Sequence, residues 1–182
     1  LVAVAESPRA EGLLYTGADD GRFAVSEDGG EAWRFVDTFP GVPERTYIAD
    51  IEASVHDADT VFVVLNNHKS GDFKPYILKS GDRGRSWAPI QGNLPARGPV
   101  WALAQDHERR GLLFAGTEFG LFFTVDGGGH WVRLKGGVPV IAMRDLEIQR
   151  REKDLVCASF GRGFYVLDDY TPLRMVTEEL LE

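Results

Sequence analysis

A box of eight residues occurs three times in the chain, and it constrains the fold more than any other feature of the sequence. The copies are SEDGGEAW from Ser26, SGDRGRSW from Ser80 and TVDGGGHW from Thr124. They share Ser or Thr at the first position, Asp at the third, Gly at the fifth and Trp at the eighth, and we call this pattern the box. The copies begin 54 and 44 residues apart. Self-similarity at such a period is typical of repeat proteins.

Apolar, strand-like residues stand on both sides of every box, which predicts that each box is the turn of a β-hairpin. An Asp at such a corner can accept hydrogen bonds from backbone N–H groups, and the Gly can adopt positive φ. The Ser or Thr hydroxyl can bond across the turn, and the Trp can pack on the sheet as an apolar anchor. We therefore assign a structural role to the box residues, which are Ser26, Asp28, Gly30, Trp33, Ser80, Asp82, Gly84, Trp87, Thr124, Asp126, Gly128 and Trp131.

The box resembles the Asp-box, or BNR, repeat S-x-D-x-G-x-x-W, found in bacterial sialidases, xyloglucan-cleaving glycosidases and the luminal domain of sortilin. Residues 116–131 and 158–169 are also similar to large secreted bacterial proteins of the sortilin-like and BNR glycosyl hydrolase group. The resemblance implies a β-propeller and an extracytoplasmic location, periplasmic or secreted. It implies no single activity, because the family includes both hydrolases and non-enzymatic receptors.

Four repeats align along the chain and predict an all-β fold. The inner-strand triplets 3–5, 50–52, 102–104 and 145–147 are equivalent, and a polar turn and further strands follow each triplet. The pattern predicts one propeller segment over 1–182, with four four-stranded blades forming a partial or a four-bladed ring. The fourth box is degraded, so its last strand lies at 173–177 or the tail TEELLE turns helical. The predicted blades cover approximately 1–37, 46–91, 99–135 and 140–177.

Composition excludes several classes of protein. A hydrophobic content of 43% with 21 glycines suits an all-β chain with many tight turns. A net charge of −8 without a basic stripe argues against nucleic acid as a partner. No run of 18 apolar residues predicts a membrane span, and no segment has the pattern of a signal peptide. The single cysteine, Cys157, permits no disulfide within the chain, and we expect no cofactor and no metal.

The first residue is Leu1, inside a predicted inner strand. The proteins that the sequence resembles carry more blades and further domains. We therefore expect that the chain is a segment that pairs with a second copy, closes alone, or needs blades of a longer parent chain. An unclosed arc would expose apolar blade faces, which normally associate.

The inner-strand triplets differ between repeats at their outer positions. Repeats one and three carry Ala at both positions, whereas repeats two and four carry Asp and Glu. Alternation along a strand places each acidic pair on one face. Such carboxylates can bind a cation or polar ligand, or act as the acid and base of glycoside cleavage. The alternative is pairing with arginine, since buried carboxylates must be paired or protonated. The candidates are Asp50, Glu52, Asp145 and Glu147, with Arg45, Arg144 and Arg162 as their partners.

Repeat two also has a long polar loop, 66–75, where the other repeats have about four residues. Long polar loops on a rigid scaffold often carry function. His68 and Asp72 of this loop are candidate ligand-binding residues, and a solvated insertion is the alternative. Two potential ligands four residues apart do not by themselves make a metal site.

Three functions follow as hypotheses. The first is a non-catalytic scaffold or binding module for protein, peptide or glycan. The second is part of a glycoside hydrolase of the sialidase or xyloglucanase kind; for the latter, Asp50 and Asp145 are the only carboxylates suitably placed. The third is a self-associating unit that completes a propeller with a second copy, as a homodimer. No nucleophile elbow, phosphate-binding loop or HExxH motif is present in the sequence.

Overall fold

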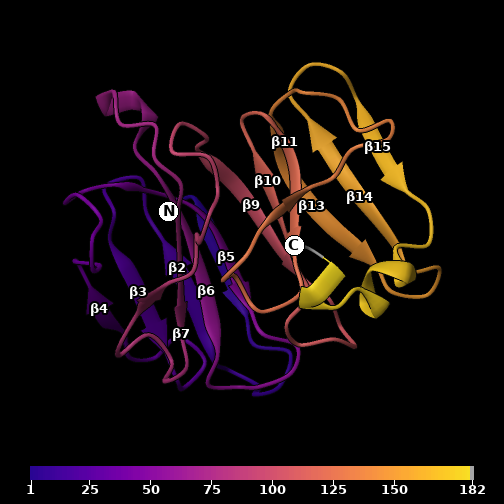
Figure 1. The fold of residues 1–182 in the computed structure, drawn as a ribbon. Coiled ribbons are helices and arrows are strands. Elements are labelled where there is room, and N and C mark those ends of the chain that lie inside the picture. The colour runs from indigo at the N-terminus through magenta and orange to yellow at the C-terminus, as the bar shows by residue number, and fades with distance from the viewer. Residues whose placement is uncertain (181–182) are drawn as a thin grey trace.

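The computed structural model describes residues 1–180 and contains four antiparallel sheets in chain order, which we call blades 1 to 4 (Figure 1). Blade 1 contains β1 (Ala3–Glu6), β2 (Leu14–Gly17), β3 (Phe23–Ser26) and β4 (Arg34–Val36). Blade 2 contains β5 (Tyr47–Ala53), β6 (Val61–Asn66), β7 (Tyr76–Ser80) and β8 (Ala88–Pro89). Blade 3 contains β9 (Val100–Gln105), β10 (Leu113–Thr117), β11 (Gly120–Thr124) and β12 (Val132–Arg133). The predicted all-β fold of four blades is confirmed.

Blade 4 differs from the others, because it has three strands within the described residues. These are β13 (Met143–Gln149), β14 (Asp154–Ser159) and β15 (Phe164–Leu167). The strand predicted at 173–177 is wrong, since the chain forms the 3₁₀ helix η2 at Thr171–Met175 instead. The alternative, a helical tail, is confirmed in part, because Glu178–Leu180 forms the 3₁₀ helix η3. The last two residues of the tail lie outside the described residues.

The core is divided among the contacts between successive blades. Inner strand β1 packs on β5, β5 on β9, and β9 on β13. One apolar cluster joins blades 1 and 2, a second joins blades 2 and 3, and a third joins blades 3 and 4. Strands alternate their side chains between two faces, so an interior blade contributes to two of these clusters. The free energy of folding therefore resides in the stacking of neighbours, as in other repeat proteins.

Each box connects two paired strands, and its polar residues form the same turn. In the first copy, the Ser26 hydroxyl donates to Asp28 Oδ1 at 2.8 Å and accepts the Gly30 N–H at 2.8 Å. Asp28 Oδ1 also accepts the Ala32 N–H at 3.0 Å. These hydrogen bonds satisfy backbone donors that a tight turn leaves without partners in the sheet.

The box tryptophans pack between blades, and not only on their own sheet. Trp131 of blade 3 is 3% exposed, lies in the cluster between blades 2 and 3, and donates through Nε1 to the Ile90 carbonyl of blade 2 at 2.9 Å. Trp87 of blade 2 stacks edge-on against Phe23 of blade 1, with ring centroids 5.2 Å apart. Trp33 of blade 1 is half-buried and donates to Gly30 of its own box. Trp87 and Trp131 thus anchor their blades to the preceding ones.

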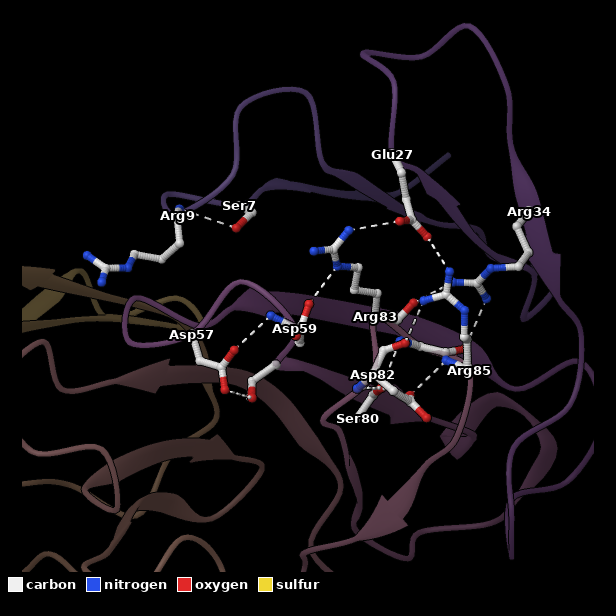
Figure 2. Close-up of polar contacts among 12 residues, drawn as sticks. Ser7, Arg9, Glu27, Arg34, Asp57, Asp59, Ser80, Asp82, Arg83 and Arg85 are labelled. Carbon is white, nitrogen blue, oxygen red and sulfur yellow. Dashed lines mark hydrogen bonds and ion pairs between the residues drawn. The ribbon is translucent and has the colours of Figure 1, made fainter.

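Ion pairs reinforce the contact between the boxes of blades 1 and 2 (Figure 2). Arg83 joins Asp59 at 2.7 Å and Glu27 at 2.8 Å, and Arg85 joins Glu27 at 2.7 Å. Arg34 of blade 1 donates to the Arg83 and Gly84 carbonyls. Because these side chains are partly exposed, their ion pairs help to align the two blades but add little to the free energy of unfolding.

Arg174 occupies the position of the tryptophan in the degraded fourth box, and it also contacts the preceding blade. Its guanidinium binds Asp106 of blade 3, which is fully buried, with Nη2–Oδ1 at 2.7 Å. The Tyr170 hydroxyl donates to the same carboxylate at 2.6 Å. Burial alone would raise the pKa of Asp106, but the hydrogen bonds from Arg174 and Tyr170 outweigh it and lower the pKa. A buried ion pair thus replaces the apolar anchor of the other boxes.

The helices of the described residues are all short 3₁₀ turns, and none is long and apolar enough to cross a membrane.

Candidate functional site

Three inner strands carry a one-residue irregularity at the same place, immediately before the equivalent triplets. Ala49 has no partner in the pairing of β5 with β6, since Ile48 pairs with Leu65 and Asp50 with Val64. Trp101 is the extra residue of β9, and Arg144 is the extra residue of β13. Such β-bulges turn a side chain away from the regular alternation of the strand. Here they bring residues from blades 2, 3 and 4 to one end of the inner strands.

A pocket of about 570 Å³ lies beside these bulges. The loops that line it join the second and third strands of blades 2 and 3, and β8 to β9. A smaller pocket adjoins it and shares His68, Trp101 and Arg144. The lining residues of the larger pocket are His68, Phe73, Arg97, Pro99, Trp101, Glu118, Phe119 and Arg144.

Trp101 lines both pockets and is held on three sides. The Arg144 guanidinium lies over the indole, with Cζ 3.5 Å from the ring centroid. The indole Nε1 donates to Glu118 Oε2 at 2.9 Å, and the His68 ring meets the indole edge-on with centroids 5.0 Å apart. A cation over an indole and a carboxylate at its N–H fix the ring in one orientation. The pocket therefore contains a rigid, half-buried aromatic surface.

Both signs of charge and further aromatic rings surround Trp101. Arg144 Nη2 lies 3.9 Å from Glu118 Oε2, so the two groups of opposite charge lie side by side at the indole. Phe73 is 41% exposed and Phe119 is 48% exposed. Aromatic surface combined with a few charged groups is typical of sites that bind sugars or peptide side chains.

The long loop of blade 2 supplies one wall of the pocket, and the structure separates its two candidate residues. His68 lines the pocket and its Nδ1 lies 2.6 Å from Asn66 Oδ1. Asp72 instead accepts the Tyr76 hydroxyl proton at 2.6 Å and the Lys74 N–H. Within residues 1–180, no three His, Cys, Asp or Glu side chains converge on a point where a metal ion could lie.

The inner-strand carboxylates of blade 2 bind backbone amides of blade 3. Asp50 Oδ2 accepts the Leu103 N–H at 2.8 Å, and Asp50 Oδ1 accepts the N–H of the next residue, Ile51, at 2.8 Å. Glu52 Oε1 accepts the Gln105 N–H at 3.3 Å. Within the described residues, no ion pair joins an inner-strand carboxylate to Arg45, Arg144 or Arg162, and Arg144 lies near Glu118 instead. A strand edge with unpaired N–H groups satisfies the carboxylates instead.

The three arginines lie in different places. Arg144 belongs to the Trp101 pocket, and Arg45 lines a separate surface pocket with Asp20 and Asp37. Arg162 lies exposed in the turn between β14 and β15.

Burial changes the acidity of two of these carboxyls. Desolvation raises the pKa of Asp50 to about 6, against the hydrogen bonds from Leu103 and Ile51 that lower it. Desolvation, followed by the negative charge of Asp50, raises the pKa of Glu52 to about 8. Glu52 and Glu147 line one cavity of about 310 Å³ between the inner strands. At neutral pH Glu52 is therefore mostly protonated.

Sequence analysis placed His68 and Arg144 among the site candidates but missed Trp101 and Glu118. A signal for Trp101 exists, because the residue before each triplet also varies between repeats, being Val2, Ala49, Trp101 and Arg144. In a strand with regular alternation, the residue before the triplet would not reach the pocket that the blades share. The β-bulge brings it there, and the position of the bulge depends on how the sheets pack.

No protein-family model matches the chain, and no curated protein matches it. Several solved structures, in contrast, match the chain in fold. The GH74 xyloglucanase from Xanthomonas campestris superposes with a TM-score of 0.74 at 17% identity, covering 93% of this chain and 29% of that one. YCF48 bound to D1 peptide gives 0.66 at 16% identity, covering 93% and 51%. The extracellular domain of the putative one component system BT4673 from B. thetaiotaomicron gives 0.67 at 18% identity, covering 93% and 21%.

The chain thus spans about half the length of YCF48 and less of the other two proteins. At these identities the likeness concerns the fold. Together with four sheets that pack in chain order on their inner strands, it shows that the chain is a β-propeller segment.

Proposed function

We propose that this chain is a non-catalytic binding module and that the Trp101 pocket takes a glycan or a peptide. The observation that carries the proposal is the fixed orientation of Trp101 by Arg144, Glu118 and His68 beside an open pocket. A ring that is rigid before binding loses little conformational entropy when a ligand stacks on it. The neighbours are consistent with this reading, since YCF48 was solved with a bound peptide.

We further propose that the boxes are Asp-box repeats of the BNR group and that the protein is sortilin-like and extracytoplasmic. The three S/T-x-D-x-G-x-x-W copies and their shared turn geometry support the first part. The extracellular domain among the structural neighbours supports the location. The approximate blade limits given above, within one segment 1–182, belong to the same proposal.

The binding proposal is tested by calorimetric titration with xyloglucan oligosaccharides, cello-oligosaccharides and a library of short peptides. For any probe that binds, Trp101→Ala should weaken binding by about thirtyfold, the effect of losing a hot-spot aromatic of about 2 kcal/mol. Arg144→Ala should also weaken it, because the guanidinium both orients the ring and offers a charge. Arg151→Ala, at an exposed turn, is the matched control and should leave affinity unchanged. Binding that persists in both pocket variants would place the ligand elsewhere.

A glycoside hydrolase is the second candidate, and one observation favours it. Glu52 is a protonated carboxyl at neutral pH and shares a cavity with Glu147. Acid and base catalysis of glycoside cleavage requires two carboxyl groups, and a protonated one can serve as the acid. Asp50 is a weaker candidate than the sequence suggested, because two backbone amides occupy its oxygens.

This alternative predicts release of reducing sugars from some member of a polysaccharide panel. If the cavity that Glu52 and Glu147 line is the catalytic site, the release of reducing sugars should fall with Glu147→Gln and persist with Trp101→Ala. No release from the wild-type chain or from a longer parent chain on the whole panel would reject it.

A further inference from the structure

Arg144 contacts two aromatic rings and has unused capacity for hydrogen bonds. Its Cζ lies 3.5 Å from the centroid of the Trp101 ring and 4.9 Å from that of Phe160. Within residues 1–180, its Nε is buried without a hydrogen-bond partner, and its ion pair with Glu118 is 3.9 Å long, beyond a hydrogen bond. Rings that stack on a guanidinium occupy its faces and leave the N–H edge, which is the part that binds carboxylates bidentately.

The two adjoining pockets carry an excess of positive charge. Arg97 lines the larger pocket, Lys69 lines the smaller one, and Arg144 lines both. Arg97 and Lys69 each lie over an aromatic ring, and neither forms an ion pair with another described residue. Glu118 is the single carboxylate in the lining. Because the chain as a whole has a net charge of −8, this local excess of cations distinguishes the pockets and favours an anionic ligand.

Glu118 limits the charge that this anion can carry. Its Oε2 accepts the Trp101 Nε1–H at 2.9 Å and stands 3.9 Å from Arg144 Nη2, so it lies beside the place where an anion would bind. Like charges repel at such distances. A carboxylate, with one negative charge, therefore fits this site better than a phosphate group with nearly two.

The remaining wall of the larger pocket is apolar and offers few acceptors. The apolar lining residues are Phe73, Pro99, Trp101 and Phe119. The side-chain acceptors are Glu118 and Nε2 of His68, since His68 Nδ1 donates to the amide oxygen of Asn66 at 2.6 Å. A sugar brings several hydroxyl donors that each need an acceptor, whereas an apolar peptide side chain needs none. The composition of the wall favours a peptide.

The position of Arg144 indicates where in the peptide the carboxylate lies. Arg144 lines both pockets, whereas Phe119 lines only the larger one and Lys69 only the smaller one. A carboxylate bound to Arg144 therefore has a pocket on each side. The end of a peptide chain would fill one of them, but the side chain of an internal residue lets the peptide continue into both.

We propose that the Trp101 pocket selects an acidic peptide segment, in which the carboxylate of an internal Asp or Glu pairs with Arg144 and an adjacent apolar side chain packs against Phe73 and Phe119. Arg97 and Lys69 attract the charge of the segment and guide its approach. This inference rests on the proposed function of the pocket and names the ligand that the pocket prefers.

An array of acetylated and amidated hexapeptides, probed with the fluorescently labelled chain, tests the proposal. Both ends of such peptides are uncharged, so every carboxylate in them belongs to a side chain. Peptides with Asp or Glu beside Phe, Leu or Ile should bind, and their Asn or Gln counterparts should bind about tenfold more weakly. The affinity for an acidic peptide, measured by fluorescence anisotropy, should also fall as the salt concentration rises, because ions screen partly exposed charges.

Substitutions in the protein assign the effect to the pocket. Arg144→Gln should weaken binding of the acidic peptide about tenfold and leave the affinity for its Asn counterpart unchanged. Arg144→Lys keeps the charge without the N–H edge and should bind with an intermediate affinity. Arg151→Gln is the matched control, since it removes the same charge at an exposed turn, and it should bind like the wild type. The exchange of Asp for Asn in the peptide needs no protein variant, so the test does not depend on how a variant folds.

Four results would overturn the proposal. If acidic peptides and their amide counterparts bind equally and Trp101→Ala abolishes both, the pocket remains a binding site and its selection of an anion fails. If the same peptides bind only with a free C-terminus, the carboxylate is a terminal one. If oligogalacturonate binds and no peptide does, the ligand is an acidic glycan. If no peptide and no oligosaccharide binds, the proposed function fails as well.

Discussion

At the scale of single residues, the box tryptophans contribute unequally because the blade before each one differs. Trp131 is enclosed between blades 2 and 3 and donates to Ile90, whereas Trp33 is half-buried and donates to Gly30 of its own box. Trp131→Ala should therefore reduce the free energy of unfolding by about 3–5 kcal/mol. Trp33→Ala is the matched substitution and should cost clearly less. Urea denaturation of both variants checks this, and equal losses would contradict an anchor that acts between blades.

The carboxyl of Glu52 makes stability depend on pH. Its folded pKa, about 8, lies above the usual value, so protonation favours the folded chain. This contribution is fully present below the ordinary glutamate pKa of about 4.3 and is lost as the pH rises through 8. Glu52→Gln should thus leave the melting temperature nearly unchanged at pH 5 and raise it at pH 8.5, relative to wild type. A variant whose melting temperature differs from wild type by the same amount at both values would refute the raised pKa.

The sequence predicted residue chemistry well where it is local and poorly where it depends on packing. The hydrogen bonds of the box follow from residues within one turn, such as Ser26, Asp28 and Gly30. The partners of Asp50 and Glu52 are backbone amides of the next blade, which no side-chain pattern indicates. The Trp101 pocket depends on bulges whose position is set by the packed sheets.

At the scale of elements, contacts between blades alternate in kind. Between blades 2 and 3, acidic side chains of β5 bind β9. Between blades 1 and 2, and between blades 3 and 4, the corresponding positions hold alanines, and β2 and β10 carry Gly17 and Gly116 in equivalent registers. Small residues let these inner strands approach the next blade closely. The two kinds of contact between blades, carboxylate–amide bonds and close packing of small residues, account for the acids and alanines that alternate at the outer triplet positions.

The close approach predicts the effect of adding a methyl group. A Cβ at Gly17 would lie 2.5 Å from Ile48 Cγ2, and one at Gly116 would lie 2.8 Å from the Met143 carbonyl oxygen. Gly17→Ala and Gly116→Ala should each destabilise the fold by about 1–3 kcal/mol, because the neighbouring blade must shift. Gly81→Ala is the control, since no atom lies within 4 Å and its φ is not positive. Unchanged melting in the two test variants would show that the blades are loosely packed there.

Element assignment from sequence succeeded for blades 1 to 3 because hairpins with apolar flanks are local features. After Asp169 it left a strand at 173–177 and a helical tail as alternatives, and the 3₁₀ helices η2 and η3 form there. The reason is tertiary. Tyr170 and Arg174 bind the buried Asp106 of blade 3, which holds this segment on the neighbouring blade and away from the edge of β15.

At the scale of the whole molecule, the core and the candidate site lie in different places. The core is divided among the contacts between successive blades, and the Trp101 pocket lies where the bulged ends of β5, β9 and β13 meet. Since loops on a rigid scaffold can vary without changing the blades, the pocket can be specific while the blades keep one geometry. Within the described residues, inner-strand carboxylates of blade 2 join it to backbone amides of blade 3.

Amide hydrogen exchange measured by NMR tests that claim most directly. The Leu103 amide should exchange slowly in the wild type and faster in Asp50→Ala, while amides in β14 remain protected. A Leu103 amide that exchanges equally in wild type and Asp50→Ala would contradict the claim.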